Sequence, residues 1–201
     1  MFKLRYSTTS PFVRKVRVTA AETGQANDIE LVKTNPADLA TGIGKDNPLN
    51  KVPALVLEDG SSLYDSCVIC EFLDERHQGA KLFPKPGQAR WAALRRMALA
   101  DGMVDASVLR MQESRRPENL RSAEWDQRQK LKVMQGLDAL EREAASFGDV
   151  VDIGTLTVAI MLDYLDFRFK SDDWRSVCPN LARWHAKFRQ RASLQATMPF
   201  E

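Results

Sequence analysis

The first 33 residues constrain the fold most, because a strand, a helix and a second strand follow one another closely there. FKLRY at 2–6 has the character of a short strand, and DIELVK at 28–33 that of a second one. Between them, Val13, Val16 and Ala20 recur at helical spacing. A helical crossover of this kind joins parallel strands, so we predict a β-α-β unit with these two strands parallel.

The start and end of this first helix are also marked in the sequence. Ser10 suits the N-cap, and Pro11 suits the first helical position, where its missing N–H costs nothing. Gly24 suits the C-terminal stop. We therefore place a helix start directly after the first strand.

A second group of elements completes the first part of the chain. Residues 35–51 are rich in Asn, Pro and Gly, which predicts a loop with at most one helical turn. PALVLED at 53–59 and SSLYD at 61–65 are predicted to pair as an antiparallel hairpin across Asp59-Gly60. A helix from Ser66 to about His77 follows. The first 78 residues thus predict β-α-β, a loop, and then β-β-α.

The rest of the chain has a helical pattern. Two prolines and two glycines at 79–88 indicate an interdomain linker. IGTLTVAIMLDYLDFRF at 153–169 is apolar nearly all round, so its helix belongs at the centre of a bundle, with Asp152 as its cap. We predict an α/β domain at 1–78 and an all-helical domain at 89–201. The helices expected in the second are 89–115, 120–146, 152–169 and 179–192.

The composition excludes several classes of function. The chain has 201 residues, 44% of them hydrophobic and 28% charged, with a formal net charge of +2. This balance gives no reason to expect nucleic acid or an anionic membrane as partner. No apolar run is long enough to span a bilayer, and the N-terminal residues lack the pattern of a signal peptide. A cytoplasmic location is the expectation.

Metal chemistry is not expected. The chain has two histidines, His77 and His185, far apart and without neighbouring Cys or His residues. A structural zinc site needs about four ligands. We expect both histidines to be exposed and no metal site.

Cys67 and Cys70 have C-x-x-C spacing, which suits a redox dithiol, half of a zinc site or no special function. Both lie inside the helix that begins at Ser66. Cys67 falls in its first turn, where modest activation of the thiol is possible. Cys70 has apolar neighbours and is predicted to be a core residue. We expect neither cysteine to carry the chemistry.

The two residues before the cysteines are more informative. Asp65 and Ser66 stand where a strand ends and a helix begins, which is a position that binds anions. With the carboxylate of Asp65 beside the hydroxyl of Ser66, the pair suits a zwitterion such as an α-amino acid terminus. Plain helix capping is the alternative. Val52-Pro53 stands at the entrance to a strand, where a cis bond would leave the backbone of Val52 free to pair with a peptide-like ligand.

The segments SPFVRKV, NPLNKVPAL, LYDSCVICEFLDE and LDYLDFR together resemble the cytosolic glutathione S-transferases, particularly bacterial members. The resemblance implies a thioredoxin-like N-terminal domain with a mixed four-stranded sheet, a helical-bundle C-terminal domain and a homodimer. It implies that glutathione is the co-substrate and that six residues bind it, namely Lys33, Lys51, Val52, Pro53, Asp65 and Ser66.

Within that set the resemblance also implies separate roles. Val52 pairs its backbone with the cysteinyl part of glutathione, and Pro53 is cis. Asp65 and Ser66 hold the γ-glutamyl end. Lys51 reaches the glycyl carboxylate, and Lys33 assists it.

The expected reaction is attack by the glutathione sulfur on a hydrophobic electrophile. A hydroxyl near the start of the first helix stabilises the thiolate, with Ser10 as the first candidate and Thr9 and Ser7 in reserve. Glutaredoxin-like relatives have C-P-[FY]-C where this chain has Ser10-Pro11-Phe12-Val13. The basic stretch Arg14, Lys15 and Arg17 is expected to be mainly a solvated face, although an inward arginine would aid the thiolate.

The electrophile is expected between the domains, against the first long helix of the second. The residues predicted for this site are Phe12, Met103, Ala106 and Arg110. For Met103, a place in the core of the bundle is an equal alternative.

Two other functions stay open, a non-catalytic binding or regulatory module and a glutathione-dependent thiol oxidoreductase or peroxidase. One departure from the family is that Asp152 and Thr155 reverse the usual order of the residue pair that caps the central helix.

Overall fold

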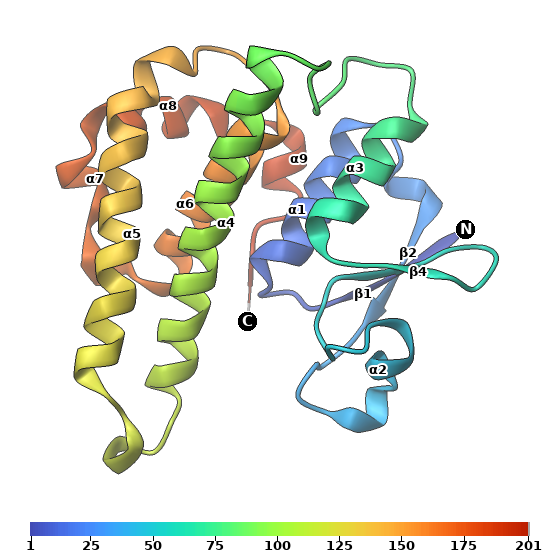
Figure 1. Ribbon diagram of the computed structural model, residues 1–201, viewed down its shortest axis with the longest axis horizontal. Coiled ribbons are helices and arrows are strands. Elements are labelled where there is room, and N and C mark those ends of the chain that lie inside the picture. The colour runs from blue at the N-terminus through green and yellow to red at the C-terminus, as the bar shows by residue number, and fades with distance from the viewer. Residues whose placement is uncertain (201) are drawn as a thin grey trace. The chain divides into compact units, whose positions relative to one another are not determined.

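A computed structural model describes residues 1–200 of the chain. It divides into two compact units (Figure 1). The first contains Met1–Pro84 and the C-terminal segment from Ala192 onward, and the second contains Lys85–Arg191. The return of the last segment to the first unit differs from the expected helical domain, which ran to the C-terminus. The physical reason is that the side chain of Leu194 is fully buried there.

The first unit is built on a mixed four-stranded sheet, as predicted, in the order β2-β1-β3-β4. β1 pairs in parallel with β2 and antiparallel with β3, and β3 pairs antiparallel with β4. The unit's strands are β1 (Phe2–Tyr6), β2 (Ile29–Lys33), β3 (Ala54–Val56) and β4 (Ser62–Leu63), and its helices are α1 (Pro11–Glu22), α2 (Ile43–Asp46), α3 (Ser66–Arg76) and α9 (Ala192–Gln195).

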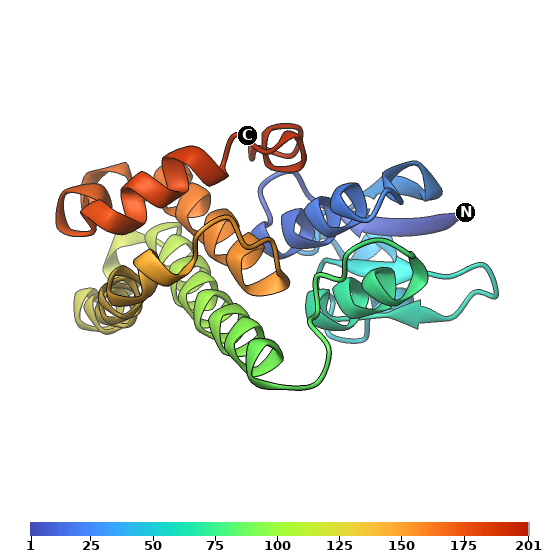
Figure 2. The same cartoon turned by 90° about the horizontal axis from the view of Figure 1, so that it is seen from above.

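The core of the first unit lies between the sheet and the neighbouring helices α1 and α3 (Figures 1 and 2). Leu4 and Leu55 from the sheet meet Val16 from α1 and Ile69 from α3, and all four are fully buried. α1 ends where predicted, because Gly24 takes a φ of +73°, which a residue with a side chain rarely adopts. This packing holds the helix starts of α1 and α3 firmly against the sheet.

The second unit is helical, as predicted. Its helices are α4 (Gln88–Ser114), α5 (Ala123–Glu143), α6 (Ile153–Arg168), α7 (Trp174–Val177) and α8 (Pro179–Phe188). Every residue of α6 from Ile153 to Leu165 is buried, so this helix is the centre of the unit, as its apolar sequence predicts. The short helix α7 is an addition to the predicted set. Within residues 1–200, no helix has both the length and the hydropathy of a membrane span.

The start of α6 explains how the reversed residue pair still works. The Asp152 carboxylate accepts from the Thr155 N–H at 2.8 Å, and the Thr155 hydroxyl accepts from the Asp152 N–H at 3.0 Å. This is a complete capping box with its acidic and hydroxyl members exchanged. Gly154 is needed beside it, because a Cβ there would lie 2.5 Å from the carbonyl oxygen of Ala93 in α4.

Candidate functional site

The strand register brings four segments of the first unit to one edge of the sheet. The end of β1 pairs with the end of β2 (Tyr6 with Lys33) and with the start of β3 (Arg5 with Ala54). β4 runs antiparallel to β3, so it also ends at this edge. The segments that meet there are Lys33, the loop at 7–10, Val52-Pro53 and Asp65-Ser66.

Ser10 stands at the junction between this edge and α1. Its Oγ accepts a hydrogen bond from the Val13 N–H at 3.3 Å, which makes it the N-cap that the sequence predicts. Accepting this bond uses a lone pair of the hydroxyl and leaves its hydrogen able to donate. Ser7, Thr9 and Ser10 are all half-buried in the loop and helix start that follow β1.

The Val52–Pro53 peptide bond is cis, as predicted, and leads directly into β3. Pro53 is buried and Val52 is half-buried. The turn before it is held by Asn47, whose side-chain amide donates to the Lys51 carbonyl at 2.9 Å. The side chain of Lys51 is exposed, as is that of Lys33 at the end of β2. Lys51 therefore presents an exposed cation directly before the cis-proline turn, and Lys33 presents another two strands away in the sheet.

Asp65 is the N-cap of α3, and its carboxylate accepts from the Cys67 N–H at 2.9 Å. Asp65 is nevertheless exposed, whereas Ser66 is 1% exposed at the first helical position. The Tyr64–Asp65 peptide bond is cis, which the sequence did not predict. A carboxylate, a hydroxyl and a helix N-terminus therefore come together at this point, as zwitterion binding requires.

The basic stretch of α1 is not the solvated face that the sequence suggested. Arg14 and Lys15 are buried, with 4% and 1% of their surface exposed, while Arg17 is half-buried. The Lys15 ammonium donates to the Cys67 sulfur at 3.4 Å, across the contact between α1 and α3. The burial of Arg14 and Lys15 was missed because their partners, Thr197 and Leu194 for Arg14 and Cys67 for Lys15, lie far away in the sequence.

The cysteines differ in environment. Cys70 is fully buried, as predicted, and its sulfur accepts from the Thr19 hydroxyl at 3.3 Å. All three cysteines are thiols rather than members of a disulfide. Burial raises the pKa of the Cys178 thiol to about 11, so this group stays protonated at neutral pH.

The residues expected around the electrophile have different surroundings. Phe12 is half-buried on α1. Met103 and Ala106 on α4 are 2% exposed, and Met103 fills the space above Gly136 of α5, where a Cβ would lie 2.4 Å from its sulfur. Met103 therefore belongs to the bundle core, which was the alternative to a place in the pocket.

Arg110 on α4 is also paired with residues of the helical unit. It donates to Asp172 at 2.7 Å and to Asp126 at 3.2 Å, and its guanidinium lies over the ring of Phe169. Burial of Asp172 opposes its ionisation, but the hydrogen bonds from Lys130 and Arg110 outweigh that cost and lower the pKa of this carboxyl. Arg110 is thus a structural ion-pair residue.

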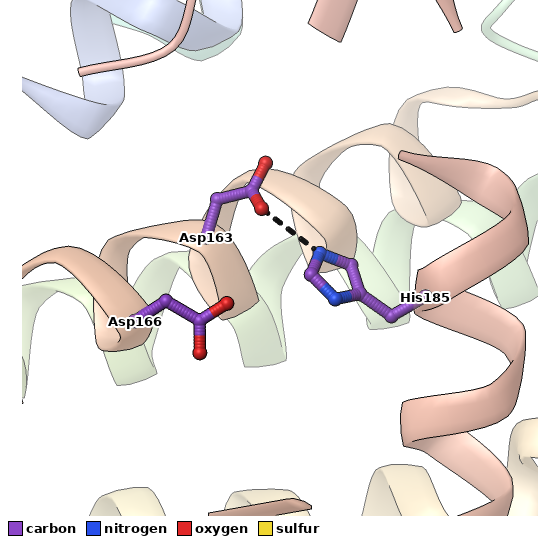
Figure 3. A group of neighbouring side chains, drawn as sticks. All are labelled: Asp163, Asp166 and His185. Atoms are coloured by element: carbon purple, nitrogen blue, oxygen red, sulfur yellow. Dashed lines mark ion pairs between the residues drawn. The ribbon is translucent and has the colours of Figure 1, made fainter. Parts of the chain in front are cut away.

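His77 is half-buried rather than exposed, and His185 departs further from the same expectation, because it is fully buried. Its Nε2 lies 3.1 Å from Asp163 of α6, and Asp166 is near enough for the three side chains to suit a metal ion (Figure 3). However, both nitrogens of the Arg175 fork bond Asp166, and Arg189 lies 3.1 Å from Asp163. A metal ion would have to displace two guanidinium groups, so we interpret this group as an internal ion-pair network.

A cavity of about 390 Å³ opens beside this network. It is lined by Asp166, Phe169, Lys170, Asp173, Trp174, Arg175 and Arg189. Its wall contains both cations and carboxylates, and Arg175 and Asp166 form an ion pair with each other. Its lining has no residue in common with the sheet edge of the first unit.

A thioredoxin-like unit with a cis-proline turn at one edge of its sheet, followed by a helical unit, is the architecture of the glutathione transferase class. Comparison with known proteins agrees with this class. Residues 9–76 match the glutathione S-transferase N-terminal domain, and residues 123–187 match the glutathione S-transferase C-terminal domain.

Individual relatives span the whole chain. The "uncharacterized GST-like protein YibF" of Escherichia coli K12 is 32% identical over 98% of both chains. A glutathione transferase family member of Pseudomonas fluorescens Pf-5, solved with glutathione bound, is 41% identical over 100% of both chains, with a TM-score of 0.96. A second structure from Pf-5 holds S-(propanoic acid)-glutathione and is also 41% identical, over 99% of this chain and 100% of that one, with a TM-score of 0.92. The chain therefore belongs to the glutathione S-transferase family.

Proposed function

We propose that this protein is a glutathione transferase that joins the glutathione thiolate to a hydrophobic electrophile. The observation that carries the proposal is the strand register, which brings the Ser10 hydroxyl, the cis-proline turn and the Asp65-Ser66 helix start to one edge of one sheet. Each of these features alone is common in proteins. Their meeting at one edge provides a site for a small peptide with a thiol near its middle.

Glutathione has a zwitterionic γ-glutamyl end, a central cysteine and a glycyl carboxylate, and each part has a counterpart here. Asp65 takes the ammonium group, while Ser66 and the α3 N-terminus take the neighbouring carboxylate. The backbone of Val52 pairs with the cysteinyl residue. The exposed cation of Lys51, assisted by Lys33, meets the glycyl carboxylate.

The thiol is then activated by its position. A free thiol with a pKa near ~8.5 is mostly protonated at neutral pH. The Ser10 hydroxyl donates to the sulfur, and the start of α1 adds a positive potential, so both favour the thiolate. One pKa unit corresponds to about 1.4 kcal/mol, which one charge-assisted hydrogen bond and a helix dipole can supply. No general base is needed, and the thiolate attacks the electrophilic carbon directly.

The electrophile and the assembly complete the proposal. Within α1, Phe12 is the residue that we propose to contact the electrophile, because it lies two positions after Ser10 and is half-buried. S-(propanoic acid)-glutathione in the Pf-5 relative is a glutathione substituted at sulfur, which supports conjugation as the reaction class. We also propose a homodimer and a cytoplasmic location, where glutathione is the principal thiol.

The test combines binding with turnover. Calorimetry of the wild-type protein with glutathione should give a single site per chain, and a chromogenic aryl halide should be conjugated in a glutathione-dependent way. Binding without conjugation of any electrophile in a broad panel would instead favour a regulatory module. Reduction of a glutathione mixed disulfide at rates well above conjugation would favour the oxidoreductase, although Ser10 stands where such enzymes need a cysteine.

A further inference from the structure

The C-terminal segment is bound along the helix that carries Ser10, although some 180 residues separate the two in sequence. At the end of α1, Glu22 accepts a hydrogen bond from Ser193. Nearer its start, Arg14 donates to the Leu194 carbonyl at 3.0 Å and to the Thr197 hydroxyl at 3.3 Å. The segment therefore runs along α1 from its end towards its start, over about 12 Å at 1.5 Å per residue.

Arg14 is the residue that makes this attachment specific. Its Nη2 also lies 3.2 Å from the Met198 sulfur, so one guanidinium bonds three residues of the segment. Both sides are buried, with Arg14 at 4% exposure and Thr197 at 7%. The planar fork of arginine can hold several acceptors at once, which the single ammonium group of a lysine cannot do in the same geometry.

The same residue belongs to the turn that places the catalytic hydroxyl. The Arg14 N–H bonds the Ser10 carbonyl at 3.0 Å, and the Val13 N–H bonds the Ser10 Oγ. Any shift of Arg14 therefore moves the turn that orients the Ser10 hydroxyl. Small displacements of this kind are costly, because a misplacement of about 1 Å can lower a rate by roughly a hundredfold.

We propose that Arg14 is a positioning residue, which fixes the first turn of α1, and with it the Ser10 hydroxyl, by clamping the C-terminal segment onto the helix. The proposal deepens the function proposed above and rests on it. It assigns the C-terminal segment a part in activating the thiol, and it gives that segment no contact with glutathione. Loss of the clamp should therefore impair the thiolate without impairing the binding of the peptide.

The experiment is a double-mutant cycle between Arg14→Met and removal of residues 193–201, read by titrating the thiol of bound glutathione. Each change alone should raise the thiol pKa by about half a unit to one unit, which lowers the thiolate fraction roughly three- to tenfold. Glutathione affinity by calorimetry should stay within about twofold. In the truncated protein, Arg14→Met should add nothing further, because its partner is already gone.

Two more variants separate clamping by the arginine fork from a simple effect of its positive charge. Arg14→Lys keeps the charge but loses the fork, and it should behave like Arg14→Met. Arg17→Met makes the same change on the same helix at a half-buried position and should leave the titration unmoved. Full activity in Arg14→Lys, or an equal shift in Arg17→Met, would show that charge and not clamping acts, and would overturn the proposal.

Additive effects in the cycle, or an unmoved titration in folded Arg14→Met, would overturn it as well. Circular dichroism and thermal melting establish that each variant is folded, and the truncated protein provides the result if Arg14→Met does not fold. If wild-type protein fails to bind glutathione, the proposed function fails first. If Ser10→Ala moves the titration and Arg14→Met does not, the clamp alone is wrong.

Discussion

The helices α3 and α6 both begin with an aspartate N-cap, but the two caps differ in exposure and in hydrogen bonding. At α6, Asp152 is 5% exposed and closes on Thr155 in a reciprocal pair of hydrogen bonds. At α3, Asp65 makes one capping bond, to the Cys67 N–H, and is exposed. An aspartate at the same helix position is therefore buried in a capping box at α6 and exposed at α3.

The difference bears on the binding site that we propose at α3. In the buried capping box, the side chains of Asp152 and Thr155 are bonded to each other's backbone N–H groups, so the box serves to stabilise its helix. An open cap at the edge of a sheet keeps its carboxylate accessible to a ligand beside a positive helix end. The first four predictions test this contrast, in order of the size of the expected effect.

Asp152→Ala should cause the largest loss of stability. It removes a buried cap and leaves the Thr155 N–H without its partner, whereas the Thr155 hydroxyl keeps its bond from the Asp152 N–H, so the change should cost about 1–3 kcal/mol. Urea unfolding measures the loss, and glutathione affinity of the folded protein should be unchanged. Asp152→Ser, which keeps a capping oxygen, is the control and should lose much less. A loss below about 0.5 kcal/mol in Asp152→Ala would show that the box is not needed.

Asp65→Ala should have the opposite profile. Glutathione affinity should fall at least about tenfold, or about 1.4 kcal/mol, whereas stability should fall by less than about 1 kcal/mol because the cap is exposed. Asp65→Asn sharpens the test, since it keeps a capping oxygen and removes the charge. It should retain stability and still bind glutathione weakly. Unchanged affinity by calorimetry in Asp65→Ala would remove this residue from the site.

Asp172 extends the contrast to a carboxylate that is paired inside the helical unit. Its pKa is lowered, because the bonds from Lys130 and Arg110 outweigh the cost of burial. Stability from this group should therefore be present above the usual aspartate pKa of about 3.9 and be lost as pH falls through the lowered value. At neutral pH, Asp172→Asn should cost roughly 1–2 kcal/mol. Unfolding curves of the two proteins should converge in acid, and a constant gap would contradict the assignment.

The cysteines beside the open cap should matter least for activity. The double variant Cys67→Ser, Cys70→Ala should retain conjugating activity, with a loss of about 1–2 kcal/mol in stability from the buried Cys70 position. A chromogenic conjugation assay on the folded variant measures this. Complete loss of activity would mean that a thiol of the protein takes part in the reaction.

Much of the fold could be predicted because its signals are local. Ser10-Pro11 marks the start of α1, the apolar run at 153–169 marks the central helix, and Val52-Pro53 carries the cis bond. These features depend on a few neighbouring residues, which sequence patterns record directly. The start of α3 at Asp65-Ser66 was likewise predictable, because a strand pattern ends there where a helical pattern begins.

The misjudged residues depend on contacts between distant segments. His185 is buried because Asp163, 22 positions earlier, faces it across the helical unit. Arg14 is buried because residues at the far end of the chain supply its acceptors. No periodicity within one helix reports that a charged side chain will find such a partner. Met103 had the spacing of both a pocket and a core residue, and only the packing against Gly136 decides between them.

The most direct test of the proposed mechanism is the titration of glutathione bound to Ser10→Ala, followed by thiolate absorbance against pH. We predict that the thiol pKa rises, that affinity changes little, and that turnover at neutral pH falls by one to two orders of magnitude, or about 1.4–3 kcal/mol. Ser7→Ala and Thr9→Ala test the two reserve hydroxyls of the same loop and should leave the titration in place. A shift in either of them instead of in Ser10→Ala would mean that the hydroxyl was misassigned while the mechanism stands. If the thiol of bound glutathione titrates identically in all three variants and the wild type, no hydroxyl of this loop stabilises the thiolate, and the proposed mechanism is wrong.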